Sequence, residues 1–305
     1  MKKKFVSRRQ FFSSLATGAG ILALGKPGWA IAPGETDKSA DPFKIVSLGK
    51  SGIKTTLLGM GTGYSGGNRS SAITRAGGTV AKDLIRYAYD SGIRFFDCAD
   101  TYGTHKQTAA ALAQIPRENY TLGTKIWVGP GGIPESDRPD ADLVIDRFRK
   151  ELNTDYIDLV QIHCMTEKNW TTRYKKQMDI LDGLKSKGII KAHGVSVHSL
   201  EAMETAIETG WVDVIHVRIN PFGEAMDHHN PKVVEPLIKK LHESGKGVIG
   251  MKLIGNGAYR NDSGKIDETI KYVFGLRTVD MAIIGFEEQD QIDDYTARLR
   301  RLLKA

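Results

Sequence analysis

The chain has 305 residues and a formal net charge of +7, with 26% charged and 40% hydrophobic residues. Six positive charges precede the first acidic residue, Glu35, so the remainder carries about +1 and gives no indication of nucleic-acid binding. The two cysteines, Cys98 and Cys164, are too few for a disulfide scaffold and lack the CxxC spacing of a cluster site, although a single bond between them stays open.

The first 32 residues have the pattern of an export signal. The basic head MKKKFVSRRQFF contains the pair Arg8-Arg9 and leads into a weakly apolar run with small residues near Ala30 and Ala32. This pattern is typical of a cleaved twin-arginine signal peptide. The apolar run is short for a membrane span. We therefore expect export by the twin-arginine (Tat) translocase to the periplasm or an equivalent compartment, without a stable membrane span; an uncleaved anchor is the alternative.

Residues 33–42 form a polar linker, and we expect residues 43–305 to form one domain. Their number is usual for a single α/β barrel. The segment FKIVSLGKSGIKTTLLGMG has two short β-rich arms around a turn at residues 49–52. It predicts a hairpin that leads into a first barrel strand near residues 57–61.

Short apolar runs and amphipathic stretches alternate along the rest of the chain. The clearest helix is predicted at residues 231–244, where apolar residues recur at three- and four-residue spacing, and a last helix is predicted at residues 292–304. Eight strands alternating with helices predict an α/β fold, a closed (β/α)8 TIM barrel with an N-terminal β-hairpin. The further expected strands are residues 93–99, 120–126, 157–163, 192–197, 212–219, 247–253 and 281–286.

Polar residues stand at the ends of several of these strands, where TIM barrels carry their chemistry. Asp97, Lys125 and His163 end three consecutive strands. A strand buried on both faces has little use for such residues, so their recurrence at equivalent positions indicates a site. Ser196, Asn220 and Lys252 occupy similar positions later in the chain.

The stretch FDCADTYG adds Tyr102 to this group. A phenol with a pKa near 10 is a weak acid for protonating a carbonyl oxygen at neutral pH. We expect the Lys125 ammonium to lower the pKa of Tyr102, and Asp97 to hold that ammonium in place. His163 can donate a hydrogen bond to a substrate oxygen. Taken singly, each residue also has an ordinary structural role; their joint order favours a site.

Four motifs in this order resemble the aldo-keto reductases over residues 44–295. LGKSGIKTTLLGMGTG is similar to the family's opening hairpin and first strand, FDCADTYG to its motif after the second, LGTKI to its Thr-Lys after the third and ELNTDYIDLVQIH to the run that ends in histidine. The resemblance implies an enzyme that interconverts a carbonyl and an alcohol by hydride transfer with NADP or NAD. It makes Tyr102 the general acid, Lys125 and Asp97 its tuning pair and His163 the orienting group.

The cofactor-binding residues implied by the resemblance depart from the family pattern. Ser196 is kept, but Val197 replaces the asparagine that binds the nicotinamide carboxamide, a contact for which His198 can compensate. His216 stands where a supporting glutamine is common. In MKLIGNG the glycines allow a pyrophosphate to approach, or form only a tight turn, and Lys252 can pair with a phosphate or a substrate anion. The candidate cofactor-binding residues are Gly61, Thr62, Ser196, Val197, His216, Lys252, Gly255, Gly285 and Gln291.

Acidic residues occupy the region that follows the eighth strand. Glu287 and Glu288 lie between Gly285 and Gln291, where the family commonly has basic residues for the adenosine phosphate. Carboxylates repel a 2′-phosphate and accept hydrogen bonds from a free ribose hydroxyl, so we expect weak selectivity for NADP or a preference for NAD. Because soluble nicotinamide cofactors are scarce outside the cytoplasm, we also expect a cofactor that is bound before export and retained.

Two other interpretations stay open. A metal-dependent barrel enzyme would use some of the histidines, but their spacing is not that of a coherent ligand set, and we expect no metal site. A binding or regulatory barrel without turnover would explain Val197 and the missing basic residues. Little sequence follows residue 285 to cover the site, which favours an open mouth and a polar or extended substrate, such as a sugar. The histidines in question are His105, His163, His198, His216, His228 and His229.

Overall fold

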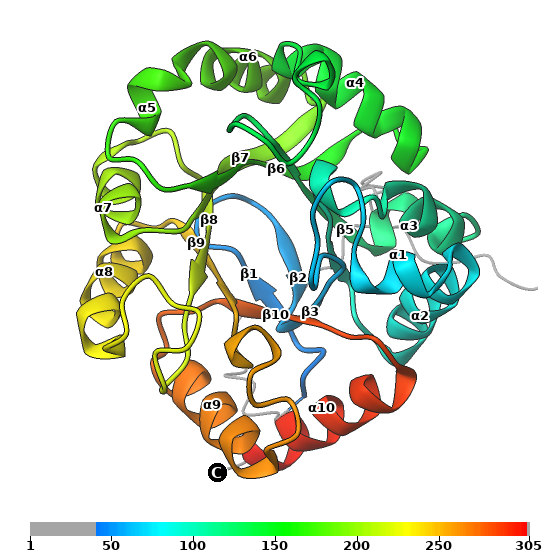
Figure 1. The fold of residues 1–305 in the computed structure, drawn as a ribbon, viewed down its shortest axis with the longest axis vertical. Coiled ribbons are helices and arrows are strands. Elements are labelled where there is room, and N and C mark those ends of the chain that lie inside the picture. Colours follow the sequence, from blue (N-terminus) through cyan, green and yellow to red (C-terminus); the bar gives the residue numbers. More distant parts are fainter. Residues whose placement is uncertain (1–40, 304–305) are drawn as a thin grey trace, which may run out of the picture. The chain divides into compact units, whose positions relative to one another are not determined.

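The structure is a computed structural model that describes residues 41–303 (Figure 1). The predicted signal peptide, residues 1–32, lies outside the described residues, as does most of the predicted linker, residues 33–42. No helix within residues 41–303 is both long enough and apolar enough to cross a membrane.

Eight strands form a closed, all-parallel barrel, which confirms the predicted (β/α)8 fold (Figure 1). Nearly all strand residues are buried, because the helices cover the outer face and side chains fill the interior. The neighbour order around the barrel is β10-β3-β4-β5-β6-β7-β8-β9. The strands are β3 (Leu58–Gly61), β4 (Phe95–Asp97), β5 (Thr121–Ile126), β6 (Ile157–Met165), β7 (Ile190–Val197), β8 (Val214–Arg218), β9 (Gly247–Met251) and β10 (Met281–Gly285).

The helices form a ring around the strands (Figure 1). The predicted helix at residues 231–244 is α8, where Asn230 caps the N-terminus by accepting a hydrogen bond from the Lys232 N–H. The last helix begins at Gln289, before the predicted start at residue 292. The prediction placed the start too late because the first residues of the helix are polar and show no apolar periodicity. The helices are α1 (Ala72–Ala76), α2 (Gly78–Ser91), α3 (His105–Leu112), α4 (Ala141–Leu152), α5 (Trp170–Arg173), α6 (Lys175–Ser186), α7 (Leu200–Glu208), α8 (Pro231–Glu243), α9 (Ser263–Gly275) and α10 (Gln289–Leu302), with short 3-10 turns η1 (Asp100–Tyr102), η2 (Arg117–Asn119), η3 (Glu135–Asp137) and η4 (Gly255–Gly257).

The predicted hairpin is present and closes the N-terminal end of the barrel. β1 (Ile45–Ser47) and β2 (Lys54–Thr56) pair antiparallel and lie in the centre of the ring in Figure 1. Leu48 and Ile53, at the hairpin turn, are buried in the inner core. Gly49 has a φ of +50°, and a β-carbon there would lie 2.4 Å from the Gly245 oxygen, so only glycine fits this contact.

The barrel interior changes character along its axis. Near the hairpin it is filled by apolar side chains, among them Phe95, Leu159, Ile249 and Met281. Toward the C-terminal ends of the strands the buried side chains become polar: Asp97, Lys125, Gln161, His163, Ser196 and His216. This polar layer lies at the end of the barrel at which the site was expected.

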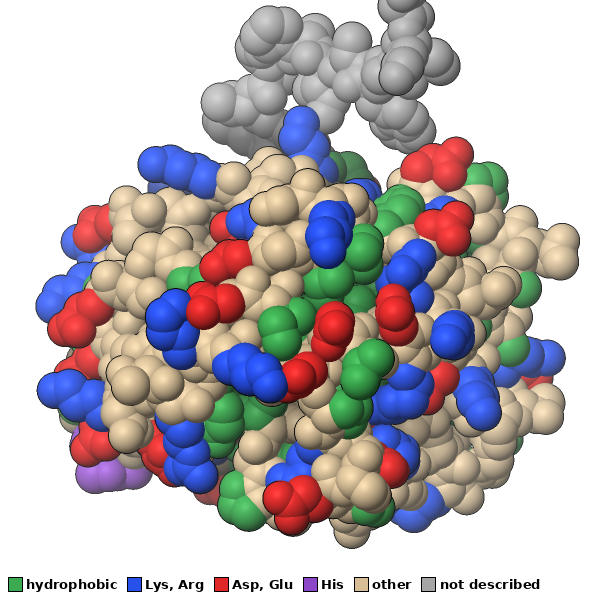
Figure 2. Space-filling model, turned by 90° about the horizontal axis from the view of Figure 1, so that it is seen from above, with side chains coloured by type: hydrophobic (Ala, Val, Ile, Leu, Met, Phe, Trp, Pro, Cys, Tyr) green, Lys and Arg blue, Asp and Glu red, His purple; other side chains and the backbone are tan. Residues whose placement is uncertain are grey.

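The surface of the described residues has mixed charge. Figure 2 shows basic and acidic side chains interspersed over the face that it presents, with apolar side chains between them. Mixing of this kind leaves no extended field of one sign on that face.

Candidate active site

Asp97 and Lys125 form a buried ion pair inside the barrel. Asp97 is the last residue of β4 and pairs with Gly123 of β5 in the strand register. Lys125 lies two residues beyond Gly123 on the same strand, so the side chains of Asp97 and Lys125 both point inward. Lys125 Nζ donates to both Asp97 carboxylate oxygens at 2.6 Å and to the Cys98 carbonyl oxygen at 3.0 Å. Although burial opposes ionisation, Lys125 and then His216 hold the pKa of Asp97 at about 2. The Asp97 carboxylate is therefore ionised at neutral pH.

Tyr102 lies in η1, directly after β4. Its ring faces Lys125 Nζ, 5.2 Å from the ring centroid, while its hydroxyl lies 3.4 Å from His163 Nε2. Burial and then the charge of Asp97 raise the pKa of Tyr102 well above its ordinary value. This differs from the expected lowering of the pKa by Lys125, because all three ammonium protons are directed to Asp97 and Cys98 and none to the phenol oxygen. Tyr102 is thus a protonated donor at neutral pH.

His163 lies between two aromatic rings. Its imidazole makes edge contacts with Tyr102, at a centroid distance of 5.6 Å, and with Trp127, at 5.3 Å. Burial and then Lys125 lower the pKa of His163 well below its ordinary value, so the ring is neutral. Nδ1 is buried without a partner among the described residues. An unpaired acceptor costs less than an unpaired donor, so the proton belongs on Nε2, which faces Tyr102.

Ion pairs hold the segment that carries Tyr102 in place. Asp100, in the same 3-10 turn, accepts two hydrogen bonds from Arg147 of α4, at 3.0 and 2.7 Å, and one from Arg69, at 3.2 Å. The Asp100 side chain is almost fully buried. Charged bidentate contacts of this kind restrict the orientation of the turn, and therefore the place of the phenol.

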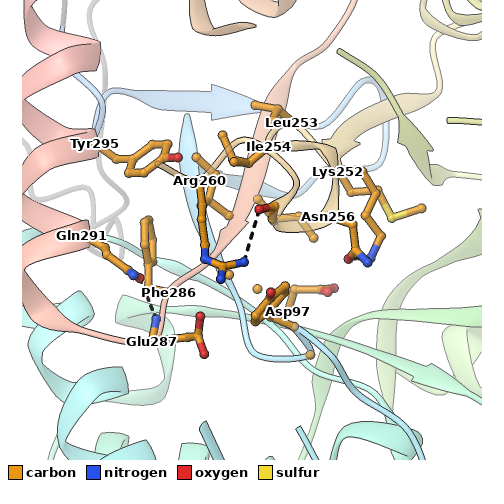
Figure 3. A pocket seen from close by; sticks show the side chains of 18 of the residues that line it. Asp97, Lys252, Leu253, Ile254, Asn256, Arg260, Phe286, Glu287, Gln291 and Tyr295 are labelled. Carbon is orange, nitrogen blue, oxygen red and sulfur yellow. Dashed lines mark hydrogen bonds between the residues drawn. The ribbon is translucent and has the colours of Figure 1, made fainter. Parts of the chain in front are cut away.

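A cavity of about 300 Å³ opens beside Tyr102 (Figure 3). One end is bounded by Asp97, Tyr102 and Lys252, and its lining extends to the loop after β10 and to α10. The lining includes the apolar side chains Met251, Leu253, Ile254, Ile283, Ile284, Phe286 and Tyr295, and the charged side chains Arg260, Glu287, Asp290 and Asp294. A mostly apolar cavity with a few polar groups is usual for a small-molecule or cofactor site.

Four of the predicted cofactor-binding residues line this cavity: Gly61, Lys252, Gly285 and Gln291. Lys252 Nζ donates to Asn256 Oδ1 at 2.8 Å, and Gln291 Oε1 accepts from the Glu287 N–H at 2.8 Å. Arg260 was not predicted. It lies in the loop between β9 and α9, and its guanidinium reaches between α10 and the Lys252–Asn256 side of the cavity (Figure 3). No periodicity marks a loop residue of this kind, so the sequence contains no signal for it.

Three predicted residues are held in other contacts and do not line the cavity. The Thr62 hydroxyl donates to the Asp97 carbonyl oxygen at 2.9 Å. Ser196 Oγ accepts a hydrogen bond from the Cys164 N–H at 2.8 Å. Val197 is fully buried in the core between barrel and helices, so it offers neither a polar atom nor a surface.

Gly255 and His216 also lie outside the cavity. A β-carbon at Gly255 would meet Tyr259 at 2.5 Å, so this glycine serves close packing. His216 is fully buried, with Nε2 3.3 Å from Asp97 Oδ1, and neither ring nitrogen has a hydrogen-bond partner among the described residues. It therefore acts on the Asp97–Lys125 pair, in place of the carboxamide contact that was predicted for it.

A second cavity of about 210 Å³ lies beside the residues that follow β5 and β6. Trp127, which contacts His163, forms part of its wall with Cys164, Glu167 and Tyr174. Trp127 was not predicted; it is the first residue after β5, two residues beyond Lys125. Among residues 41–303, no three His, Cys, Asp or Glu side chains are placed to hold a metal ion.

Sequence comparison relates the chain to one family. Residues 57–269 match the model described as "Aldo/keto reductase family". The chain is 29% identical to "Aldo-keto reductase YhdN" of Bacillus subtilis, over 61% of this chain and 56% of that protein. It is 25% identical to the "NADH-specific methylglyoxal reductase" of Escherichia coli, over 61% of this chain and 62% of that protein. The matched region thus covers less than two thirds of these relatives.

Solved structures show the same fold. An aldo-keto reductase from Pseudomonas aeruginosa superimposes with a TM-score of 0.68 at 22% identity, over 86% of this chain and 97% of that one. An aldo/keto reductase from Klebsiella pneumoniae in complex with NADP and acetate has a TM-score of 0.61 at 16% identity, over 83% of this chain and 89% of that one.

Proposed function

The chain belongs to the aldo/keto reductase family, and from this premise we propose that it is an NAD(P)-dependent oxidoreductase that interconverts an aldehyde or ketone and an alcohol. The observation that carries the proposal is the convergence of Tyr102 and His163, 3.4 Å apart, beside a cavity that is bounded by Asp97 and Lys252. A neutral proton donor with a neutral hydrogen-bond donor next to its hydroxyl suits the protonation of a carbonyl oxygen.

Each residue of the tetrad has a role in this proposal. Tyr102 gives its proton to the carbonyl oxygen, and His163 Nε2–H orients that oxygen. Lys125 lies under the Tyr102 ring, 5.2 Å from the ring centroid, and fixes that face of the phenol. Asp97 holds the Lys125 side chain in place. Because Asp97 and Lys125 neutralise each other, no net charge opposes the return of the proton.

The cavity beside Tyr102 fits a nicotinamide dinucleotide, which when bound supplies or accepts the hydride. Phe286 and Tyr295 form an aromatic wall for a base, with centroids 5.7 Å apart. Gly61 and Gly285 present backbone without side chains, and the Arg260 guanidinium is a donor for a phosphate. Family members include one named as NADH-specific and one solved with NADP, so both cofactors occur among the relatives.

We propose that NAD is preferred over NADP. Glu287, Asp290 and Asp294 line the cavity with Gln291, and Arg260 is the sole basic side chain on this part of the described lining. Carboxylates at the adenosine end repel a 2′-phosphate and accept hydrogen bonds from a ribose hydroxyl. Fluorescence titration of the protein with NADH and with NADPH tests the preference, and tighter binding of NADPH would contradict it.

The experiment that tests the activity is the substitution Tyr102→Phe. With general acid catalysis at Tyr102, kcat for reduction of small aldehydes falls by about 10²- to 10⁴-fold, while cofactor affinity stays close to that of the wild type. The second candidate, a binding or regulatory barrel, predicts instead that Tyr102→Phe leaves every measured activity unchanged. Buried Val197 and protonated Tyr102 are the observations in its favour.

We further propose that the protein is exported through the twin-arginine route with its cofactor bound. The support is the Arg8-Arg9 pair and the residues around it. Replacing both arginines by lysine should leave the protein in the cytoplasmic fraction. Protein from the periplasm should release nicotinamide absorbance when denatured gently; an empty protein would count against retention.

The substrate that we propose is a polar or extended carbonyl compound. The second cavity has Trp127 and Tyr174 in its wall, and Trp127 contacts His163, so this cavity is our candidate for substrate atoms beyond the carbonyl. Screening sugars and other carbonyl compounds and alcohols with both cofactors identifies the class.

A further inference from the structure

The C-terminal end of the barrel carries a positive charge that the proposed proton transfer does not use. Lys125 is paired with Asp97, and Arg218, the last residue of β8, is paired with Asp227. Lys252, directly after β9, has no carboxylate partner among the described residues. Of these three cations, Lys252 is therefore the one that is not compensated by an ion pair among the described residues.

Arg218 and Lys252 are neighbours across two strands. Arg218 pairs with Met251 in the β8–β9 register, and Lys252 is the next residue. Arg218 lies two residues after His216, whose ring points into the barrel beside Asp97. Because alternate residues of a strand share a face, Arg218 lies on the inward side, one layer above that ring and toward the open end.

One edge of the Arg218 guanidinium is free. Nε donates to Asp227 Oδ1 at 2.6 Å, and Nη2 donates to the same carboxylate and to the His198 carbonyl oxygen at 2.9 Å. The Asp227 side chain is fully buried, so the pair fixes the orientation of Arg218, which keeps 18% of its own side chain exposed. Nη1 has no partner among residues 41–303, and its two N–H groups are available to an acceptor.

Lys252 is held at the cavity wall in a strained conformation. Its φ is +60°, a left-handed value that is unfavourable for a residue with a β-carbon. Asn220 Nδ2 donates to the Lys252 carbonyl oxygen at 3.1 Å, and Asn256 accepts from Nζ at 2.8 Å. Figure 3 shows Lys252 and Asn256 together on the side of the cavity that Asp97 bounds. Strain maintained at such a place indicates a functional position for the ammonium.

These cations act on the groups around them. Burial and then Arg218, Lys252 and Lys125 lower the pKa of His198 to about 3, so this imidazole stays neutral among three positive charges. Burial and then Arg218 also lower the pKa of Lys252. An anion that arrived between Arg218 and Lys252 would remove this repulsion.

We propose that Lys252 and the Nη1 edge of Arg218 bind a carboxylate carried by the substrate, so that the preferred substrates are oxo acids whose carbonyl group lies at Tyr102. The inference rests on the proposed function. The same anionic chemistry has a second source, the pyrophosphate of the cofactor, and the experiments below separate the two.

The first experiment compares succinic semialdehyde with its uncharged methyl ester. In the wild type, kcat/KM for the acid should exceed that for the ester by about tenfold or more, and Lys252→Met should reduce this ratio by about tenfold. Lys106→Met, which removes an exposed lysine of α3, is the matched control and should keep the ratio. Equal values for acid and ester in the wild type, or an unchanged ratio in Lys252→Met, would overturn the proposal.

Arg218 needs a paired substitution, because removing it alone would leave Asp227 buried without a partner. The double variant Arg218→Gln, Asp227→Asn removes both charges and should also lower the ratio of acid to ester. NADH and NADPH are titrated against Lys252→Met in parallel. If cofactor affinity falls by about tenfold while the ratio is kept, the anion is the pyrophosphate and the proposal fails.

A binding measurement separates this inference from the proposed function. Succinate, which cannot be reduced at a carbonyl, should raise the Tm of the wild type and raise that of Lys252→Met by less. Stabilisation by succinate without turnover of any carbonyl compound would contradict the proposed function and keep the anion site. Turnover of aldehydes without stabilisation by succinate would keep the function and overturn the anion site.

Discussion

The ring of Tyr102 lies directly against the backbone of Gly63. A β-carbon at Gly63 would meet Cε2 and Cζ of that ring at 2.3 Å, and one at Gly66 would meet Cδ1 at 2.9 Å. The loop after β3 therefore fixes one face of the phenol, while Lys125 lies under the ring. Two glycines of this loop are required by the position of a single side chain.

Gly63→Ala should displace Tyr102 without straining the backbone conformation, since Gly63 does not have a left-handed φ. We expect kcat to fall by about 10- to 100-fold because the phenol moves away from the carbonyl oxygen. Gly67→Ala is the matched control: it lies in the same loop, and its β-carbon would meet no atom within 4 Å. Steady-state kinetics and a crystal structure of each variant check this. Equal kcat values for the two variants would show that the contact with Gly63 does not position the ring.

Asp97→Asn should destabilise the fold strongly, because it leaves the Lys125 ammonium buried without a counter-charge. We expect a loss of about 3–5 kcal/mol in the free energy of unfolding, measured by urea denaturation. The double variant Asp97→Asn, Lys125→Met removes both charges of this pair and should recover much of that loss. A double variant no more stable than Asp97→Asn would contradict the assignment of the cost to the unpaired ammonium.

Stability should fall in mild acid because of His198. Its folded-state pKa of about 3 lies below the ordinary value of 6.5, so between these values the unfolded chain binds a proton that the folded chain does not. Folding therefore becomes less favourable as the pH falls below 6.5. Between pH 7 and pH 5 this one group removes about 2 kcal/mol.

His198→Gln should remove that part of the pH dependence. Urea denaturation of the wild type and the variant at pH 7 and pH 5 gives the two differences. The wild type should lose about 2 kcal/mol more than the variant over this interval. Parallel losses in the two proteins would mean that His198 is protonated in the folded state as readily as in the unfolded one.

The preference for NAD should weaken when charge is removed from the adenosine end. Glu287→Gln combined with Asp290→Asn should improve NADPH affinity relative to NADH by about three- to tenfold, since each carboxylate repels a 2′-phosphate across solvent. Both residues line the cavity, and neither has an ion-pair partner among the described residues. The effect should shrink at high salt; an equal gain for NADH would point to a change in shape.

The barrel and the convergence of Asp97, Lys125 and His163 at one end of it could be predicted because they depend on local pattern. Alternating apolar runs and helical stretches determine the eight strands, and Asp97, Lys125 and His163 follow from the rule that strand ends face one side. The tuning of Tyr102 could not be predicted in the same way. The hydrogen-bond acceptors of Lys125 depend on the distance from its Nζ to the Cys98 carbonyl oxygen. A sequence contains no information on that distance.

The cofactor side was predicted less well for a related reason. Ser196 and His216 have suitable chemistry at suitable positions, yet a backbone N–H binds the first and the Asp97–Lys125 pair surrounds the second. Arg260 reaches the cavity from a loop whose path depends on tertiary packing. Burial inside a barrel and the course of long loops are properties of the whole fold.

The hairpin covers the N-terminal end of the barrel, so the barrel opens at the C-terminal ends of its strands. Any molecule that reaches Asp97 and Tyr102 comes from the C-terminal ends of the strands, because buried apolar side chains fill the interior between these residues and the hairpin. Substitutions in the loops around the opening can therefore change the site while the apolar layer near the hairpin maintains the fold. Val197 and His216, which depart from the family pattern, lie in β7 and β8, and neither belongs to the apolar layer near the hairpin.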